Sequence, residues 1–111
     1  TVVVCGDGSF QMAMNELAAV KQAGMDLKIL LFRNNTLGLV HQIQSRAPYR
    51  GPFGVDLDGS PDFETIAAAY GIPSIVVREE EELDSSMGRF LEEIGPCLLI
   101  CQVHPDVATT D

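Results

Sequence analysis

The sequence predicts a doubly wound α/β domain built on a parallel sheet. Four short segments rich in branched aliphatic residues alternate with segments whose apolar residues recur at helical spacing. The predicted strands are 2–5, 27–32, 74–77 and 97–103, and their near-continuous apolar character is typical of strands buried on both faces. Strands that alternate with helices form parallel sheets through right-handed crossovers, which fixes the class.

Three helices are predicted between these strands. Ser9 is expected to cap the first helix and Gly24 to end it. Ser60-Pro61 opens the second helix and Gly71 closes it. The acidic run Glu79–Glu82 predicts the first turn of the third helix, because carboxylates complement the positive end of the helix dipole.

The composition fits one globular domain. The chain has 111 residues, of which 46% are hydrophobic, and a domain of this size buries roughly two-thirds of its unfolded surface. Its net charge is −9, whereas proteins that bind DNA, RNA or anionic membranes generally carry the opposite sign. No apolar run approaches the ~20 residues of a membrane helix. We expect a soluble protein that binds neither nucleic acid nor membrane.

The ends and the cysteines add two expectations. The chain opens at Thr1 on an apolar strand, without an initiator methionine or a signal region, which favours a single-domain fragment (1–111) of a longer chain. Cys5, Cys97 and Cys101 lack metal-ligand or redox spacing. We therefore predict reduced, buried thiols and a cytoplasmic location.

One connection is unusually long. About forty residues separate the second and third predicted strands, and 45–59 has no periodicity. Loops of that length are usually functional or disordered. The residues that suit a ligand cover or a partner contact are Arg46, Tyr49, Arg50 and Phe53. The alternative is a mobile surface loop, and the sequence leaves the role of 45–59 open.

Ligand-binding chemistry is concentrated where the first two strands end. Gly6-Asp7-Gly8-Ser9 follows the first strand and opens a helix, so backbone N–H groups lie beside a carboxylate. Asn34-Asn35-Thr36 follows the second strand, and Asp7 and Asn34 are 27 positions apart, enough for one helical crossover. Either motif alone is also compatible with an ordinary turn. Together they predict a phosphate held through Mg²⁺, which prefers oxygen ligands.

The combined pattern resembles the signature of thiamine diphosphate enzymes. Gly6-Asp7-Gly8 is followed, after 25 residues, by Asn34-Asn35. The similarity continues through Leu37–Val40 and Ser60–Phe63 and extends up to His104-Pro105. The chain as a whole is similar to the C-terminal, diphosphate-binding domain of the acetolactate synthase large (catalytic) subunit.

This resemblance implies a cofactor site. Mg²⁺ would be held by Asp7, by the Asn34 side chain and by the Thr36 main-chain carbonyl. The implied cofactor-binding residues are Gly6, Asp7, Gly8, Ser9, Asn34, Gly38 and Leu39. Asp7 is expected at the surface edge of the sheet, so that Asp7→Ala leaves the fold intact. His41 and His104 are expected to be idle.

Three departures from the family pattern bear on the reaction. Arg33 stands where relatives often have Asn, so Asn34 rather than Asn35 is the expected ligand. Simple 2-oxoacid decarboxylases have an acidic residue at the position of Val40, and the absence of that acid here favours carboligation. Branched-chain acetohydroxyacid synthases commonly have Trp at the position of Ile43, so the similarity supports an acetolactate synthase-like enzyme rather than a named pathway.

The implied activity is decarboxylation of a 2-oxo acid such as pyruvate and carboligation to a second carbonyl. The activating glutamate of the family lies on the pyrimidine-binding domain of a second subunit, so no catalytic residue is expected within this chain and the fragment alone should be inactive. A flavin (FAD) would belong only to a missing middle domain. The alternatives are another thiamine diphosphate-dependent decarboxylase or oxidase, or a noncatalytic Mg-phosphate module.

Two expectations concern the isolated chain. Its ligand face should pack against the missing domain in a homo-oligomer, so 45–59 should be disordered or displaced. The apolar residues Leu37, Leu39, Val40 and Ile43 should promote self-association. The acceptor substrate and the oligomer size stay open.

Overall fold

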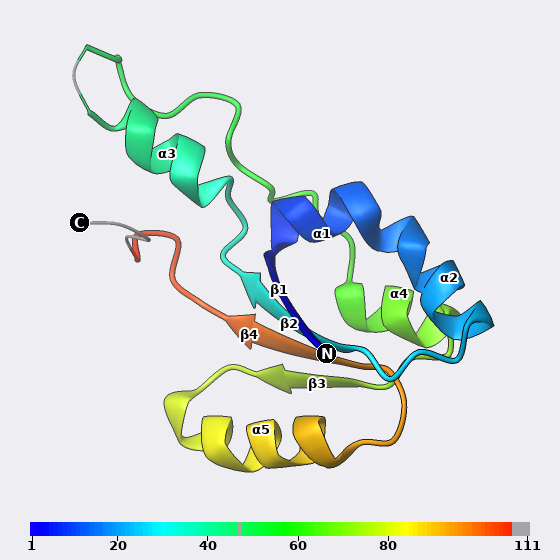
Figure 1. Cartoon of the computed structure of the whole chain (residues 1–111). Helices are drawn as coiled ribbons and strands as arrows, with labels where there is room; N and C mark the ends of the chain where they lie inside the picture. The colour runs from blue at the N-terminus through cyan, green and yellow to red at the C-terminus, as the bar shows by residue number, and fades with distance from the viewer. Residues whose placement is uncertain (47, 108–111) are drawn as a thin grey trace.

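The computed structural model describes residues 1–46 and 48–107 (Figure 1). Four parallel strands form one sheet in the order β1-β2-β4-β3. The strands are β1 (Val2–Gly6), β2 (Lys28–Arg33), β3 (Ser74–Val77) and β4 (Cys97–Gln102). The helices are α1 (Asp7–Ala13), α2 (Leu17–Gln22), α3 (Gly38–Gln44), α4 (Phe63–Ala69) and α5 (Leu83–Glu92), with 3₁₀ turns η1 (Met14–Glu16) and η2 (Glu80–Glu82). The predicted α/β class is confirmed.

Helices cover both faces of the sheet, but unequally. On one face α1, α2 and α4 pack against β2 and β4, with Phe10 and Phe63 in edge-to-face contact at 5.3 Å between ring centroids. On the other face α5 packs on β3 and β4 through Phe90. Figure 1 shows α3 standing beyond the carboxyl end of β2, away from both layers.

The burial of the strands differs from the prediction. Leu98, Leu99 and Ile100 of β4 are buried, as expected of a central strand. Val2, Val3 and Val4 of β1 are 40–60% exposed. The reason is topological, because β1 is an edge strand of this sheet and α5 packs mainly on β3 and β4. Apolar sequence alone does not distinguish an edge strand from a central one.

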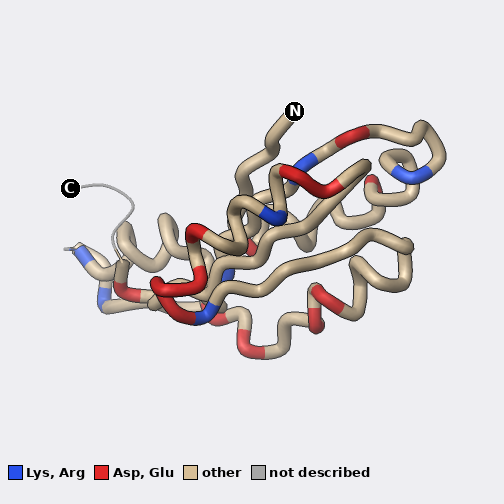
Figure 2. Tube along the Cα trace, turned by 90° about the horizontal axis from the view of Figure 1, so that it is seen from below, with Lys and Arg blue, Asp and Glu red and all other residues tan. Residues whose placement is uncertain are grey.

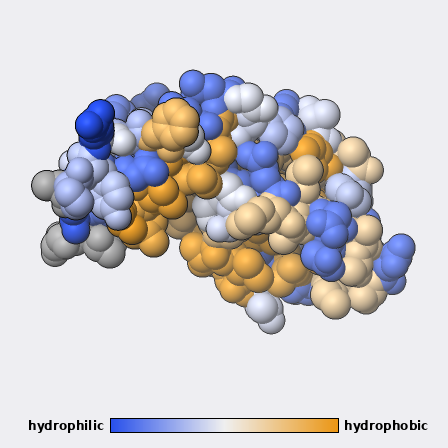
Figure 3. Space-filling view, turned by 90° about the horizontal axis from the view of Figure 1, so that it is seen from above, coloured by the Kyte–Doolittle hydropathy of each residue, from blue (hydrophilic) through white to orange (hydrophobic). Residues whose placement is uncertain are grey.

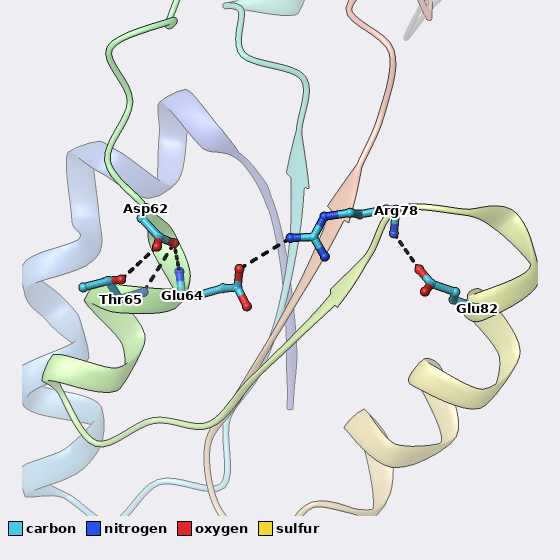
Figure 4. Close-up of polar contacts among 5 residues, drawn as sticks. All are labelled: Asp62, Glu64, Thr65, Arg78 and Glu82. Atoms are coloured by element: carbon cyan, nitrogen blue, oxygen red, sulfur yellow. Dashed lines mark hydrogen bonds and ion pairs between the residues drawn. The ribbon is translucent and has the colours of Figure 1, made fainter.

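Two helix starts also differ from the prediction. The first predicted helix is interrupted by η1, and its N-cap is Gly6 rather than Ser9, which lies inside α1. The N-cap of α4 is Asp62, whose carboxylate accepts hydrogen bonds from the backbone N–H groups of Glu64 and Thr65 (Figure 4). The hydroxyl of Thr65 also donates to Asp62, at 2.8 Å. These hydrogen bonds, the hydroxyl's first, lower the pKa of Asp62.

The acidic run before α5 begins the helix as predicted, in the form of a 3₁₀ turn. Glu79 and Glu82 form a capping box, and the Glu82 carboxylate also accepts from the backbone N–H of Arg78 at 2.9 Å (Figure 4). The Arg78 guanidinium lies 3.8 Å from Glu64 on the neighbouring α4. Figure 2 shows acidic residues spread along the chain, and they outnumber the basic ones by 16 to 7.

One buried cation lies at the amino end of the sheet. Lys28 begins β2 and is 6% exposed. Its ammonium donates to the carboxylate of Asp26 and to the main-chain carbonyls of Glu93 and Gly95, at 2.5–2.7 Å. It therefore ties β2 to the turn between α5 and β4.

Within the described ranges, none of the helices has the length and apolar character needed to cross a lipid bilayer.

Candidate functional site

A cleft of about 620 Å³ opens at the carboxyl ends of β1 and β2. This is where parallel α/β sheets bind ligands. The cleft is lined by all the residues predicted from the resemblance: Gly6, Asp7, Gly8, Ser9, Asn34, Thr36, Gly38 and Leu39. Figure 3 shows hydrophobic atoms gathered on both sides of a hollow in this part of the surface.

Asp7 is the most deeply buried polar group of the cleft. Its side chain is 1% exposed, so the expectation of a surface-edge carboxylate is wrong. One oxygen accepts from the N–H of Gly8 at 3.0 Å, and the other accepts from the N–H groups of Asn34 and Asn35 at 3.2 and 2.7 Å. The carboxylate thereby joins the turn after β1 to the turn after β2.

The charge of Asp7 has no counter-charge in the described part of the chain, where the ion pairs involve other carboxylates. Buried charges in proteins are normally paired or bound to a metal. A carboxylate offers about four acceptor positions, of which the three amides occupy three. The site therefore has both the charge and the lone pair needed to receive a cation.

The residues after β2 supply further oxygens. The Asn34 side-chain oxygen accepts from the N–H of Thr36 at 3.2 Å, and both residues line the cleft. The side chain of Asn35 instead accepts from Arg33 at 3.0 Å, and Asn35 lines a different, smaller pocket. Asn34, and not Asn35, therefore lines the cleft beside Asp7, and its role as the metal ligand stays a prediction.

Two glycines make the turns possible. A Cβ at position 8 would lie 2.6 Å from Cδ2 of Leu37, and a Cβ at position 38 would lie 2.9 Å from the side-chain nitrogen Nδ2 of Asn34. Both distances are shorter than real Cβ contacts. Gly8 therefore allows the turn after β1 to approach Leu37, and Gly38 leaves room for the Asn34 side chain at the start of α3.

The long loop is attached to the site. The carbonyl of Val55 accepts from the N–H of Leu37 at 2.8 Å and from the hydroxyl of Thr36 at 3.1 Å. The N–H of Leu57 donates to the carbonyl of Asn35 at 2.9 Å. The expectation that 45–59 is disordered or displaced is therefore wrong for its last third. Residue 47 lies outside the described residues.

The rim of the cleft holds residues of other kinds. Leu39 and Val40 are exposed apolar residues there. Half-buried Cys5 lines the cleft, and burial raises the pKa of its thiol. His104, expected to be idle in the terminal segment, also lines the cleft, whereas His41 lines neighbouring pockets. The one sign in the sequence that His104 lies near the site is that the family resemblance extends up to His104-Pro105.

Acidic metal ligands are few. Within 1–46 and 48–107, no group of three or more His, Cys, Asp or Glu side chains is placed to hold a metal ion. Asp7 is the one carboxylate among the described residues that line the cleft, where it lies beside neutral oxygens. This set of hard donors suits Mg²⁺ that shares its remaining positions with phosphate and water.

Sequence comparison finds close relatives. This chain is 36% identical over 106 residues to the acetolactate synthase large subunit of Pyropia yezoensis, covering 92% of this chain and 18% of that one. It is 37% identical over 102 residues to the mitochondrial acetolactate synthase catalytic subunit of Saccharomyces cerevisiae, covering 92% and 15%. Isozyme 1 of Escherichia coli K12 gives 35% over 106 residues, covering 94% and 19%. The chain thus spans less than a fifth of these relatives.

Solved structures and a family model agree with this similarity. Benzoylformate decarboxylase from Polynucleobacter necessarius superposes with a TM-score of 0.86 at 24% identity, covering 98% of this chain and 20% of that one, which shows a shared fold. The family model for the C-terminal TPP-binding domain of thiamine pyrophosphate enzymes matches residues 1–101. The chain therefore belongs to the thiamine pyrophosphate enzyme family and comprises its acetolactate synthase-like C-terminal TPP-binding domain.

Proposed function

We propose that this domain binds thiamine diphosphate through Mg²⁺ held by Asp7, by the side-chain oxygen of Asn34 and by the main-chain carbonyl of Thr36. The observation that carries the metal is the buried Asp7 carboxylate, which has three amide donors and no counter-charge among the described side chains. Gly6, Gly8 and Ser9 line the same cleft, and we assign them to binding of the diphosphate.

In this proposal the residues of the chain hold the metal ion and orient the cofactor. Asp7 and Asn34 come from turns that follow adjacent strands, so the sheet fixes their spacing. Leu39 and Val40 give the cleft an apolar wall, which limits water near a bound cofactor. When bound, thiamine diphosphate supplies the electron-accepting group that decarboxylation of a 2-oxo acid requires.

For the whole enzyme we propose an acetolactate synthase-like reaction, in which a 2-oxo acid such as pyruvate is decarboxylated and joined to a second carbonyl compound. The support is the 34–37% identity to acetolactate synthases and the apolar residue at position 40. The activating carboxylate is placed outside this domain, so the 111-residue chain alone should have no activity. The alternative is another thiamine diphosphate-dependent 2-oxoacid decarboxylase or oxidase.

The proposed partner is the pyrimidine-binding domain of a second subunit in a homo-oligomer. The exposed apolar residues at and beside the cleft support it, namely Leu37, Leu39, Val40 and Ile43. A cytoplasmic or similarly reducing location is proposed from the three free cysteines.

Calorimetric titration of the chain with thiamine diphosphate, with and without Mg²⁺, tests the metal site. We expect binding to require Mg²⁺ and Asp7→Asn to weaken it by about tenfold or more, since a charged ligand is lost. Asp84→Asn is the matched control, because Asp84 is an exposed carboxylate on α5, on the other face of the sheet. Equal affinity in the Asp7→Asn variant would refute the assignment.

A further inference from the structure

The segment Val55–Leu57 is far from the metal-site residues in sequence but is bonded to them in space. Between α3 and α4 the chain runs back past the turn that follows β2 (Figure 1). There Thr36 and Asp56 form an isolated antiparallel bridge. We refer to Val55–Leu57 as the brace.

Val55 anchors the brace in the interior. It is 1% exposed, whereas Asp56 beside it is exposed, as are Gly54 and Phe53 just before it, the latter at 88%. The Thr36 side chain is also buried, at 4%. Its hydroxyl donates to the Val55 carbonyl, which also accepts the N–H of Leu37, so this one carbonyl holds two consecutive residues of the site.

The turn that the brace holds is strained. Asn35 has a φ of 56°, the only positive φ among the described residues other than glycine. Such a conformation persists where the surroundings fix it. The N–H of Asn35 donates to Asp7 and its carbonyl accepts from the N–H of Leu57, so the strained residue is fixed from one side by Asp7 and from the other by the brace.

The brace also reaches the turn after β1. A Cβ at position 8 would lie 3.5 Å from Cδ1 of Leu57, so this side chain lies against Gly8. Just beyond the brace, the hydroxyl of Ser60 accepts from the amide nitrogen of Gln11 on α1, at 2.8 Å. The same short segment therefore touches both turns that build the cleft.

We propose that the brace is a positioning element of the cofactor site, with the Thr36 hydroxyl and Val55 as its positioning residues. This inference rests on the proposed function, because it assigns the brace the role of holding Asn34 and Thr36 where they bind Mg²⁺ and diphosphate. Neither the Thr36 hydroxyl nor the Val55 side chain contacts the cofactor in this proposal.

Two pairs of variants separate positioning from general stability. Thr36→Val removes the hydroxyl but keeps the shape and the main-chain carbonyl, and Thr36→Ser restores the hydroxyl. Val55→Ala and Val77→Ala remove the same two methyl groups from buried sites, the second one in β3 beneath α5, away from the cleft. Both alanine variants lose stability, but only Val55→Ala should alter the site.

The first readout is amide hydrogen exchange of the chain without ligand. Thr36→Val and Val55→Ala should speed exchange at Leu37 and Leu57 relative to amides of β4, and Val77→Ala and Thr36→Ser should not. The second readout is affinity for thiamine diphosphate with Mg²⁺, which Thr36→Val should weaken by about fivefold, the worth of one hydrogen bond, with recovery in Thr36→Ser.

The outcomes are distinct. Unchanged exchange at Leu37 and Leu57 in Thr36→Val, or faster exchange with unchanged affinity, overturns the positioning role while the proposed function stands. An equal loss of affinity in Val55→Ala and Val77→Ala also overturns it, because the effect is then one of stability. Absence of Mg²⁺-dependent binding by the unaltered chain overturns the proposed function, and this inference with it.

Discussion

The two ends of the sheet each bury one charged side chain, and they treat it differently. At the amino end, the Lys28 ammonium donates to one carboxylate and two carbonyls, so its charge is neutralised and each of its three N–H groups has an acceptor. At the carboxyl end, Asp7 has hydrogen-bond donors but no counter-charge in the described chain. The first arrangement is complete without a ligand, whereas the second is one that, in our proposal, a bound cation completes.

The largest expected effect on stability is at the complete end. Lys28→Met should lower the free energy of unfolding by about 3 kcal/mol, because the carbonyls of Glu93 and Gly95 lose their buried donor. Urea denaturation measures it. Lys21→Met is the control, since Lys21 also donates to a carbonyl but at an exposed position, and it should cost well under about 1 kcal/mol. Similar losses in both variants would show that burial of Lys28 is unimportant.

At the other end, Asp7→Ala should cost about 2 kcal/mol, because three amides lose their acceptor. This contrasts with the expectation, drawn from sequence, that the fold tolerates the change. Asp7→Asn keeps an acceptor oxygen and should cost about half as much or less. If Asp7→Ala unfolds at the same urea concentration as the unaltered chain, the carboxylate does not join the two turns.

Apolar exposure gives a third way to compare the ends. The double variant Leu39→Ser with Val40→Ser should weaken self-association of the chain by about tenfold, because both residues are exposed at the cleft. Ile94→Ser is the control, as Ile94 is 95% exposed near the amino end of β4. Sedimentation velocity over a range of concentrations measures the effect. An effect of Ile94→Ser as large as that of the double variant would place the contact surface elsewhere.

The smallest effect is expected at Asp62, which caps α4 between the two ends. Its pKa is lowered in the folded chain, so its contribution to stability is present above the unfolded pKa and is lost as the pH falls through the folded pKa. Asp62→Asn should therefore flatten the fall in unfolding free energy below about pH 4, and Thr65→Val should do so in part. Urea denaturation at stepped pH values measures it, and an unchanged pH dependence in Asp62→Asn would contradict the assignment.

The sequence predicted the elements whose signals are local. The apolar runs gave β2, β3 and β4 to within a residue or so at each end, and Gly24 and Gly71, with φ near 61° and 68°, end their helices as expected. The motif spacing predicted that Asp7 and Asn34 lie close together, because adjacent parallel strands end at the same edge, and both residues line one cleft.

What the sequence could not predict depends on partners far along the chain. Two of the amides that donate to buried Asp7 are 27 and 28 positions away, and the carbonyls that accept from buried Lys28 are 65 and 67 positions away. The brace is hidden for the same reason, since a loop without periodicity carries no sign that Val55 pairs with Thr36. The exposure of β1 follows from strand order, which composition does not reveal.

The most direct test of the difference between the two ends is the stabilisation that Mg²⁺ with thiamine diphosphate gives to the folded chain. At ligand concentrations about 100 times Kd, the free energy of unfolding of the unaltered chain should rise by about 2.7 kcal/mol. The same additions should raise that of Lys28→Met equally and that of Asp7→Asn by about half as much or less, given a loss of affinity of tenfold or more. Equal stabilisation of Asp7→Asn and the unaltered chain would contradict the claim that the buried carboxylate is completed by a bound cation.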